Sequence, residues 1–420
     1  MAIGIGGMVG GGIFAVLGLV AEQAGGGTPL AFLLAGVVAL VTASSYALLT
    51  VAYPSRGGSV VFIDRVFGVR LATGVVNNVL WFGYLVTLSL YASAFASYAA
   101  ALFDAVPTPG WLYHLLVSAA VLVPTGINLV GARFVARSET AIVVTKLVML
   151  VVVCGVGFTT VDTSRLAPGT WPPIPAIAAA GMLVFVAYEG FELIANAAED
   201  VRRPERTLPR ALYLAVGAVI VIYVAVAWVT VGSLSPEQIA TSSDFALAEA
   251  AEPSLGSVGF VIVSLSAVLA TFSAINATLY GTARLSYAIA KEGELPAVLE
   301  RDVWSEPVGL LITCGVALVL ANALDLADIS AIASAVFLLV FGLVNAAAYR
   351  LPARRRVRHV VSAAGVVGCG AALVVLLVST AQRSPVALVV LAALLAVAGG
   401  GEAVWLSRRR DVRLQDGADT

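Results

Sequence analysis

Three charged side chains lie inside long apolar stretches of this sequence. Lys146 lies eight residues into the segment 138–158, and Glu189 and Glu192 lie near the middle of the segment 176–198. A charge at the centre of a bilayer costs about 2.5–3.5 kcal/mol on insertion scales, so such groups usually face a cavity. The two glutamates are three residues apart and therefore share one face of a helix. These residues predict a polar site buried in a membrane.

A glycine-rich stretch at the start of the chain is the second feature. Residues 4–12 read Gly-Ile-Gly-Gly-Met-Val-Gly-Gly-Gly, and glycine inside a helix costs roughly 0.5–1 kcal/mol relative to alanine. A broken helix is tolerated in a membrane only where its freed N–H and C=O groups face protein or a wet cavity. Close helix packing is the alternative use of such glycines. A second break, predicted near Tyr188 to Gly190, favours a binding site.

Interrupted helices offer two kinds of backbone group to a ligand. The N-terminus of a half-helix presents free N–H groups and the positive end of a dipole, which suit a carboxylate. Gly10, Gly11 and Gly12 have no side chains, so an anion can approach their backbone closely. The carbonyl groups freed at the breaks suit an ammonium group. A ligand with both groups is an α-amino acid.

The sequence predicts no metal site and no cofactor. Cys154, Cys314 and Cys369 all lie in apolar segments, where we expect them to be small core residues. His114 and His359 are far apart in the sequence and form no ligand set. The chain also lacks the Gly-Lys-Ser/Thr motif with which a pump holds phosphate. We therefore expect a protein that is not an enzyme.

Membrane-spanning helices must position these residues. The chain is 60% hydrophobic and 12% charged, its mean hydropathy is +0.99, and a soluble domain has about 25% charged residues. A spanning helix needs about 20 mostly apolar residues. Twelve segments meet this need: 1–22, 29–52, 72–103, 111–131, 138–158, 176–198, 209–232, 254–289, 307–323, 329–349, 359–380 and 385–406. The predicted fold class is an all-α polytopic membrane protein with twelve transmembrane helices.

Positive charge alternates between the loops. All but three of the 24 Lys and Arg residues lie in the loops after the even-numbered segments or in the C-terminal tail. Cytoplasmic loops carry the excess of Lys and Arg, so we expect both termini in the cytoplasm and the protein in the plasma membrane. The net charge of -1 does not indicate nucleic-acid binding. In the outer loop 233–253, the residues Ser235-Pro236-Glu237-Gln238 predict a short helix.

Two corresponding segments are interrupted. Segments 1 and 6 are five apart in the order of spans, and so are the two longest segments, 3 and 8. Interrupted segments at matching positions of two halves indicate a transporter site built on an inverted repeat. We expect a first repeat, a second repeat, a terminal helix pair and a cytoplasmic tail, with the bounds 1–158, 176–350, 359–406 and 407–420.

Several motifs together resemble the amino acid–polyamine–organocation transporters, over helices 1 to 10. They are Gly6-Gly7-Met8-Val9-Gly10-Gly11-Gly12-Ile13-Phe14, Pro54-Ser55-Arg56-Gly57-Gly58, Phe185-Val186-Ala187-Tyr188-Glu189-Gly190-Phe191-Glu192, the stretch 199–210 and Gly293-Glu294-Leu295-Pro296. The resemblance implies the leucine-transporter-type fold of two inverted five-helix repeats plus helices 11 and 12. Only about six residues precede the glycine break, which is shorter than the family's inner half of helix 1.

The resemblance also implies a substrate site at the two breaks. It assigns the substrate carboxylate to Gly10, Gly11 and Gly12, and the amine to carbonyl groups near Met8, Val9, Phe185 and Tyr188. Phe185 lies five residues before Gly190, where such transporters place an aromatic lid, and an ordinary lipid or core contact is the alternative. Glu189 either contacts the substrate or tunes Lys146, and both Glu189 and Glu192 can instead be protonated structural groups.

Lys146 resembles the helix-5 lysine of proton-coupled members of this family. The amine of that lysine occupies the place of a sodium ion beside helices 1 and 8, so the resemblance implies that Lys146 couples proton movement to transport. A lysine that reaches the interface with its long stem is the alternative.

The sequence therefore predicts a secondary active transporter of amino acids, with protons and the lipid bilayer as its other partners. An exchanger of amino acids or polyamines without net proton coupling is one alternative. A non-transporting amino acid sensor with the same fold is another. The sequence leaves open the substrate side chain and whether the protein is a monomer or a dimer.

Overall fold

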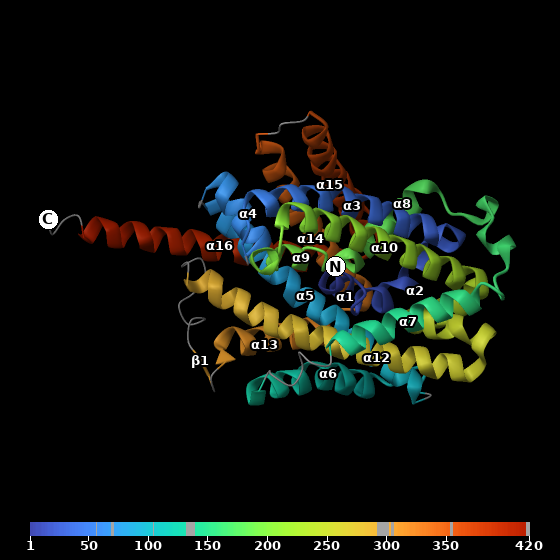
Figure 1. Ribbon diagram of the computed structural model, residues 1–420. Helices are drawn as coiled ribbons and strands as arrows, with labels where there is room; N and C mark the ends of the chain where they lie inside the picture. Colours follow the sequence, from blue (N-terminus) through green and yellow to red (C-terminus); the bar gives the residue numbers. More distant parts are fainter. Residues whose placement is uncertain are drawn as a thin grey trace.

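The computed structural model describes residues 1–55, 57–68, 71–103, 105–131, 139–291, 302–303, 306–352 and 356–416. These residues form a bundle of long helices with a minor two-stranded antiparallel sheet, β1 (Asp302–Val303) and β2 (Glu306–Pro307). Figure 1 shows most of the helices running along one common direction. Arg56 and the stretch Gly293-Glu294-Leu295-Pro296, both parts of the predicted family motifs, lie outside the described residues.

The first half of the chain supplies α1 to α7. Their bounds are α1 (Ala2–Met8), α2 (Gly12–Ala24), α3 (Thr28–Ala52), α4 (Gly58–Phe67), α5 (Leu71–Leu102), α6 (Gly110–Gly131) and α7 (Glu139–Gly157). The short 3₁₀ helix η1 (Gly25–Gly27) turns the chain between α2 and α3. Helix α4 was not expected from the sequence, because its ten residues are too few to span a membrane and lie in the connection between the second and third predicted spans.

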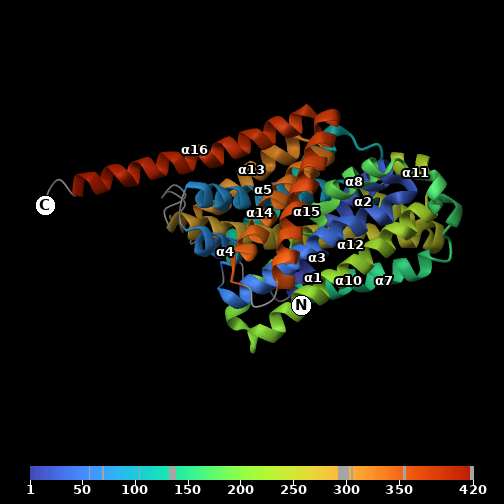
Figure 2. The same ribbon diagram turned by 90° about the horizontal axis from the view of Figure 1, so that it is seen from above.

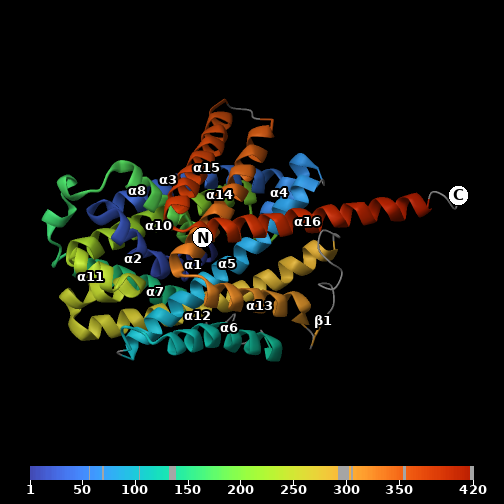
Figure 3. The same ribbon diagram turned by 180° about the vertical axis from the view of Figure 1, so that it is seen from behind.

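The second half begins after a loop that holds the 3₁₀ helices η3 (Thr163–Leu166) and η4 (Pro168–Thr170). Its elements are α8 (Ile174–Leu183), η5 (Val184–Tyr188), α9 (Leu193–Asn196), η6 (Ala198–Asp200), α10 (Pro204–Ser233), α11 (Pro236–Thr241), η7 (Ser243–Phe245), α12 (Ala246–Lys291), α13 (Val308–Ala323), α14 (Leu326–Arg350), α15 (Arg356–Arg383) and α16 (Pro385–Asp416). In Figures 2 and 3, α16 projects from the bundle toward the C-terminus.

The long apolar helices agree with the predicted spans. Nine helical stretches within the described residues are long and apolar enough to cross a membrane, and the shorter helices 141–157 and Val308–Ala323 are also apolar. One of the nine, Gly12–Ala52, includes the turn at η1 and covers two predicted segments. The chain is therefore a polytopic membrane protein. The count of twelve spans and the inverted repeat stay predictions.

Two long helices lie at the centre of the bundle. Helix α5 packs against α12, α14, α6 and α16, while α3 packs against α10, α14 and α15. The main hydrophobic core draws residues from both halves of the chain, and its largest buried side chains are aromatic. The long, mostly apolar faces of α5 and α12 therefore bring segments from the two halves together around the N-terminal helices.

The predicted short helix in the loop 233–253 is present as α11. Ser235 caps it by a capping box in which its hydroxyl accepts from the amide of Gln238, and the Gln238 side chain accepts from the amide of Ser235. Next to it, the carbonyl group of Ser243 in η7 lies so close to Gly18 of α2 that no side chain fits there. This end of the bundle is therefore tightly packed.

Candidate functional site

The first helix breaks within the glycine-rich stretch. Helix α1 ends at Met8 and α2 begins at Gly12. In a continuing α-helix, the amide of Gly10 would donate to the carbonyl of Gly6. At the break it donates instead to the carbonyl of Gly7, at 3.1 Å. The side chain of Lys146 on α7 donates instead to the Gly6 carbonyl, with a distance of 2.9 Å from Nζ to the oxygen. The predicted break thus creates a backbone acceptor that a lysine uses.

The second break lies where the sequence predicts it. Helix α8 passes into η5, which ends at Tyr188, and Glu189 is extended with φ -61° and ψ 147°. Gly190 follows with φ +112°, a conformation that L residues with a side chain rarely adopt. The chain resumes as the short helix α9. The extended Glu189 and the unusual Gly190 turn both carboxylates away from a regular helical path.

The two breaks touch each other. A Cβ atom added to Gly190 would lie 2.6 Å from the carbonyl carbon of Gly7 and 2.7 Å from the amide nitrogen of Met8. A Cβ atom added to Gly7 would lie 3.1 Å from the backbone of Gly190. The backbones of the two interrupted helices therefore cross in contact, and the crossing needs glycine on both sides.

A tyrosine of α10 bonds to both breaks. The Tyr223 hydroxyl donates to the carbonyl of Met8 at 2.6 Å and to that of Ala187 at 3.1 Å. Tyr223 is fully buried. Carbonyl groups that an unbroken helix would satisfy internally are thus satisfied by a side chain from a third helix.

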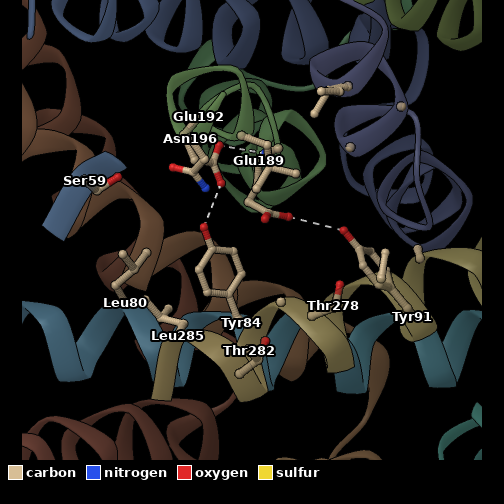
Figure 4. A pocket seen from close by; sticks show the side chains of 18 of the residues that line it. Ser59, Leu80, Tyr84, Tyr91, Glu189, Glu192, Asn196, Thr278, Thr282 and Leu285 are labelled. Carbon is tan, nitrogen blue, oxygen red and sulfur yellow. Dashed lines mark hydrogen bonds between the residues drawn. The ribbon is translucent and has the colours of Figure 1, made fainter. Parts of the chain in front are cut away.

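A cavity of about 350 Å³ lies beside this crossing. Its lining comes from the start of the chain, from α4, α5 and α7, from the second break and from α12: Ile3, Gly6, Gly7, Gly57, Ser59, Val60, Leu80, Tyr84, Tyr91, Val143, Lys146, Glu189, Gly190, Glu192, Leu193, Asn196, Ser273, Ala274, Ala277, Thr278, Gly281, Thr282 and Leu285. Figure 4 shows Ser59, Tyr84, Tyr91, Thr278 and Thr282 around the two glutamates. The cavity thus gathers buried polar side chains between helices that are otherwise apolar.

The two glutamates are held differently in this cavity. Glu192 accepts hydrogen bonds from the amide of Gly190 at 2.8 Å and from the hydroxyl of Tyr84 at 3.2 Å. Glu189 accepts from the hydroxyl of Tyr91 at 3.2 Å, and both bonds from the tyrosines are drawn in Figure 4. The side chains are 6% and 2% exposed at Glu189 and Glu192. Glu192 thus stabilises the bend at Gly190, while Glu189 is attached to α5 through Tyr91.

Three of the predicted site residues line the cavity: Lys146, Glu189 and Gly190. Lys146 is 4% exposed, so its amine ends inside the protein and does not extend to an interface.

The other predicted site residues are buried next to the cavity, outside its lining. Met8 and Val9 lie in the core. Gly10 faces Gly7, Gly11 faces the ring of Tyr91, and Gly12 faces Ala187. Phe185 packs edge-on against Phe341 with ring centroids 5.9 Å apart, and the Tyr188 hydroxyl donates to the carbonyl of Phe32 at 2.8 Å. These residues form the wall behind the crossing.

Sequence reasoning missed the polar residues that α5 and α12 contribute to the cavity. They are Tyr84, Tyr91, Ser273, Thr278 and Thr282. Each is a single hydroxyl in a long apolar helix, and such residues recur along the chain without any spacing that marks a site. Within the described residues, no group of three or more His, Cys, Asp or Glu could hold a metal ion.

A helical membrane bundle in which two interrupted helices cross beside a cavity with buried polar side chains has the architecture of a solute transporter. The chain belongs to the amino acid permease family, whose sequence pattern matches residues 1–399. The protein is accordingly a membrane transporter and not an enzyme, as the sequence predicts.

Named relatives agree with this assignment. The inner membrane transport protein YbaT of Escherichia coli is 33% identical over 84% of this chain and 82% of its own length. The chloroplastic cationic amino acid transporter 9 of Arabidopsis thaliana is 28% identical over 71% of this chain and 55% of its own. The large neutral amino acids transporter small subunit 2 of Mus musculus is 28% identical over 70% of this chain and 57% of its own.

Proposed function

We propose that the protein is a secondary active transporter of amino acids that works by alternating access across the plasma membrane. The contact between the breaks at Gly7 and Gly190, beside a cavity that holds Lys146 and Glu189, carries this proposal. The family and the two relatives named for amino acid transport support the substrate class. Those relatives are named for cationic and for large neutral amino acids, so their names leave the side chain open.

The substrate binds at the crossing and extends into the cavity. Backbone N–H groups of Gly10, Gly11 and Gly12 hold its carboxylate, and the carbonyl groups of the broken segments around Met8, Val9, Phe185 and Tyr188 hold its amine. In the described conformation these groups lie behind the cavity wall, so binding requires the two breaks to part at their contact. A transporter of this kind changes conformation in each cycle, and glycines at both breaks keep the barrier to that movement low.

The cavity extends toward the arginine-rich ends of the helices, since Gly57, Asn196 and Leu285 line it. The opposite end is closed by the contact of Gly18 with Ser243 and by the rings of Phe14 and Tyr98, whose centroids are 5.9 Å apart. With the arginine-rich loops in the cytoplasm, this conformation corresponds to the inward-facing half of the cycle. Twelve spans with two inverted five-helix repeats are the architecture that this cycle uses.

Transport is coupled to protons through Lys146. Its Nζ atom lies 2.9 Å from the Gly6 carbonyl at the end of α1, so the charge on Lys146 acts directly on the first break. A protonated lysine donates to this carbonyl with a full charge, and a neutral lysine binds it more weakly. Proton release therefore loosens α1, and this links the proton to the movement of the break.

Three experiments test the proposal. Counterflow of labelled amino acids in proteoliposomes distinguishes a transporter from a sensor that binds without transporting. An imposed pH gradient then distinguishes symport, which accumulates substrate, from exchange without net proton movement. A thermal-shift screen of the twenty amino acids and common polyamines identifies the substrate, because a ligand raises the melting temperature of the folded protein. No shift with any of these compounds would refute the substrate assignment.

A further inference from the structure

A second cavity, here called the interfacial groove, lies apart from the substrate site. It has a volume of about 700 Å³, and none of its lining residues lines the central cavity. The lining comes from the C-terminal ends of α3 and α14 and the N-terminal ends of α10 and α15. These four helices pack against one another in the pairs α3–α10, α3–α14, α3–α15 and α14–α15, and Figure 1 shows them together. The groove is therefore a built feature of four helix ends.

The groove combines apolar walls with two opposite charges. Leu48, Val51 and Val361 supply apolar surface, while Glu205 and Arg358 supply a carboxylate and a guanidinium group. Both charged residues are exposed, and no ion pair joins them in the part of the chain that the structure describes. Tyr213, which is 44% exposed, adds a phenol to the lining. The groove thus offers separate sites for an anion and a cation above an apolar floor.

Its position fits the border between water and hydrocarbon. The neighbouring chain is rich in arginine at 202–210 and at 350–358, as expected at the cytoplasmic membrane surface. On the same part of α15, the side chains of Val357 and Val360 are 69% and 61% exposed. Exposure of these apolar side chains to water is unfavourable, whereas lipid acyl chains would cover them. A ligand in the groove therefore has one polar end and one apolar end.

We infer that the interfacial groove binds a zwitterionic phospholipid of the phosphatidylethanolamine type. The phosphate lies at Arg358 and the phenol of Tyr213, the primary ammonium lies at Glu205, and the upper acyl chains lie along Leu48, Val51 and Val361. The head group of phosphatidylglycerol carries its phosphate charge but no cation, so it leaves the Glu205 carboxylate without a charged partner. A trimethylammonium head group cannot donate a hydrogen bond to the Glu205 carboxylate, so phosphatidylcholine fits less well.

Native mass spectrometry of the purified full-length protein tests this inference. The protein is titrated in detergent with equal amounts of phosphatidylethanolamine, phosphatidylglycerol and phosphatidylcholine of the same acyl chains. We expect phosphatidylethanolamine to be retained best. In Arg358→Gln its retention falls by about fivefold, the effect expected from one basic residue at a membrane surface. In Glu205→Gln the preference over phosphatidylglycerol is lost.

Arg383→Gln, at the other end of α15, is the matched control and should retain lipid as the wild type does. Melting temperatures measured without lipid show whether each variant is folded, and an unfolded Arg358→Gln is replaced by Arg358→Lys, which keeps the charge and should keep the lipid. Equal retention of the three lipids by the wild type would overturn the inference. Three other results would overturn it as well: stronger retention of phosphatidylglycerol by the wild type, wild-type retention of phosphatidylethanolamine in Arg358→Gln, or an unchanged preference over phosphatidylglycerol in Glu205→Gln.

Discussion

The hydroxyl of Tyr223 lies 2.6 Å from the carbonyl oxygen of Met8, in the interior of the bundle. The same hydroxyl lies 3.1 Å from the carbonyl of Ala187. A phenol has one proton to donate, so the two carbonyl groups compete for it. Tyr223 therefore holds both interrupted helices to α10 through one hydrogen atom, and any movement that separates the breaks must rearrange this bond.

Removing this hydroxyl should affect both stability and transport. In Tyr223→Phe, two buried carbonyl groups lose their donor, and an unsatisfied buried polar group costs about 1–3 kcal/mol. We expect a lower melting temperature in detergent, together with a changed apparent substrate affinity in proteoliposomes, because the breaks are no longer held in one arrangement.

Tyr98→Phe is the control for this effect. Tyr98 is equally buried and its hydroxyl donates to the carbonyl of Phe14 at 3.3 Å, away from the crossing. This variant should lose stability while its substrate affinity stays as in the wild type. If both variants changed the substrate affinity to the same extent, the Tyr223 hydroxyl would have no specific role in substrate binding.

The glycine at the second break should not tolerate a side chain. Gly190→Ala places a methyl group 2.6 Å from the carbonyl carbon of Gly7 at a residue with φ +112°. Backbone strain of this kind costs about 1–3 kcal/mol, and the contact forces the two breaks apart. We expect a lower melting temperature and loss of counterflow. The matched control is Gly217→Ala in α10, where an added Cβ atom meets nothing within 4 Å, and normal transport by Gly190→Ala would contradict the tight crossing.

The ability of Lys146 to release and regain a proton should matter more than its charge or its capacity to donate a hydrogen bond. Lys146→Gln keeps a donor for the Gly6 carbonyl but cannot carry a proton, while Lys146→Arg keeps the charge and does not release its proton near neutral pH. We expect both variants to bind substrate, measured by thermal shift, and to lose accumulation driven by a pH gradient. Arg165→Ala, in the loop between α7 and α8, is the control. Accumulation that still follows the pH gradient in Lys146→Gln would rule out this lysine as the proton carrier.

Much of the fold could be predicted from the sequence, because each long helix contains a long apolar stretch. The two breaks were also predictable, since a glycine-rich stretch and two carboxylates are local signals that a spanning helix rarely tolerates. The contact of Gly7 with Gly190 was not, because residues so far apart in sequence meet only through tertiary packing. The same holds for Tyr223 and Tyr91, which read as ordinary aromatic residues in apolar helices. Helix α4 was missed because its ten residues are too few to span a membrane.

The two cavity glutamates should separate into a substrate ligand and a structural anchor. Glu189 accepts a hydrogen bond from the Tyr91 hydroxyl at 3.2 Å. Glu192 accepts one from the backbone amide of Gly190 at 2.8 Å and so fixes the bend. We expect Glu189→Gln to keep the wild-type melting temperature and to weaken substrate binding by about tenfold, which corresponds to ~1.4 kcal/mol. The loss should be larger for amino acids with cationic side chains, because a carboxylate binds a cation more strongly than an amide does.

Glu192→Gln should instead lower the melting temperature, since the Gly190 amide loses its charged acceptor. Thermal shift measures both quantities in one titration, and equal effects of the two variants on affinity would show that Glu189 does not contact the substrate.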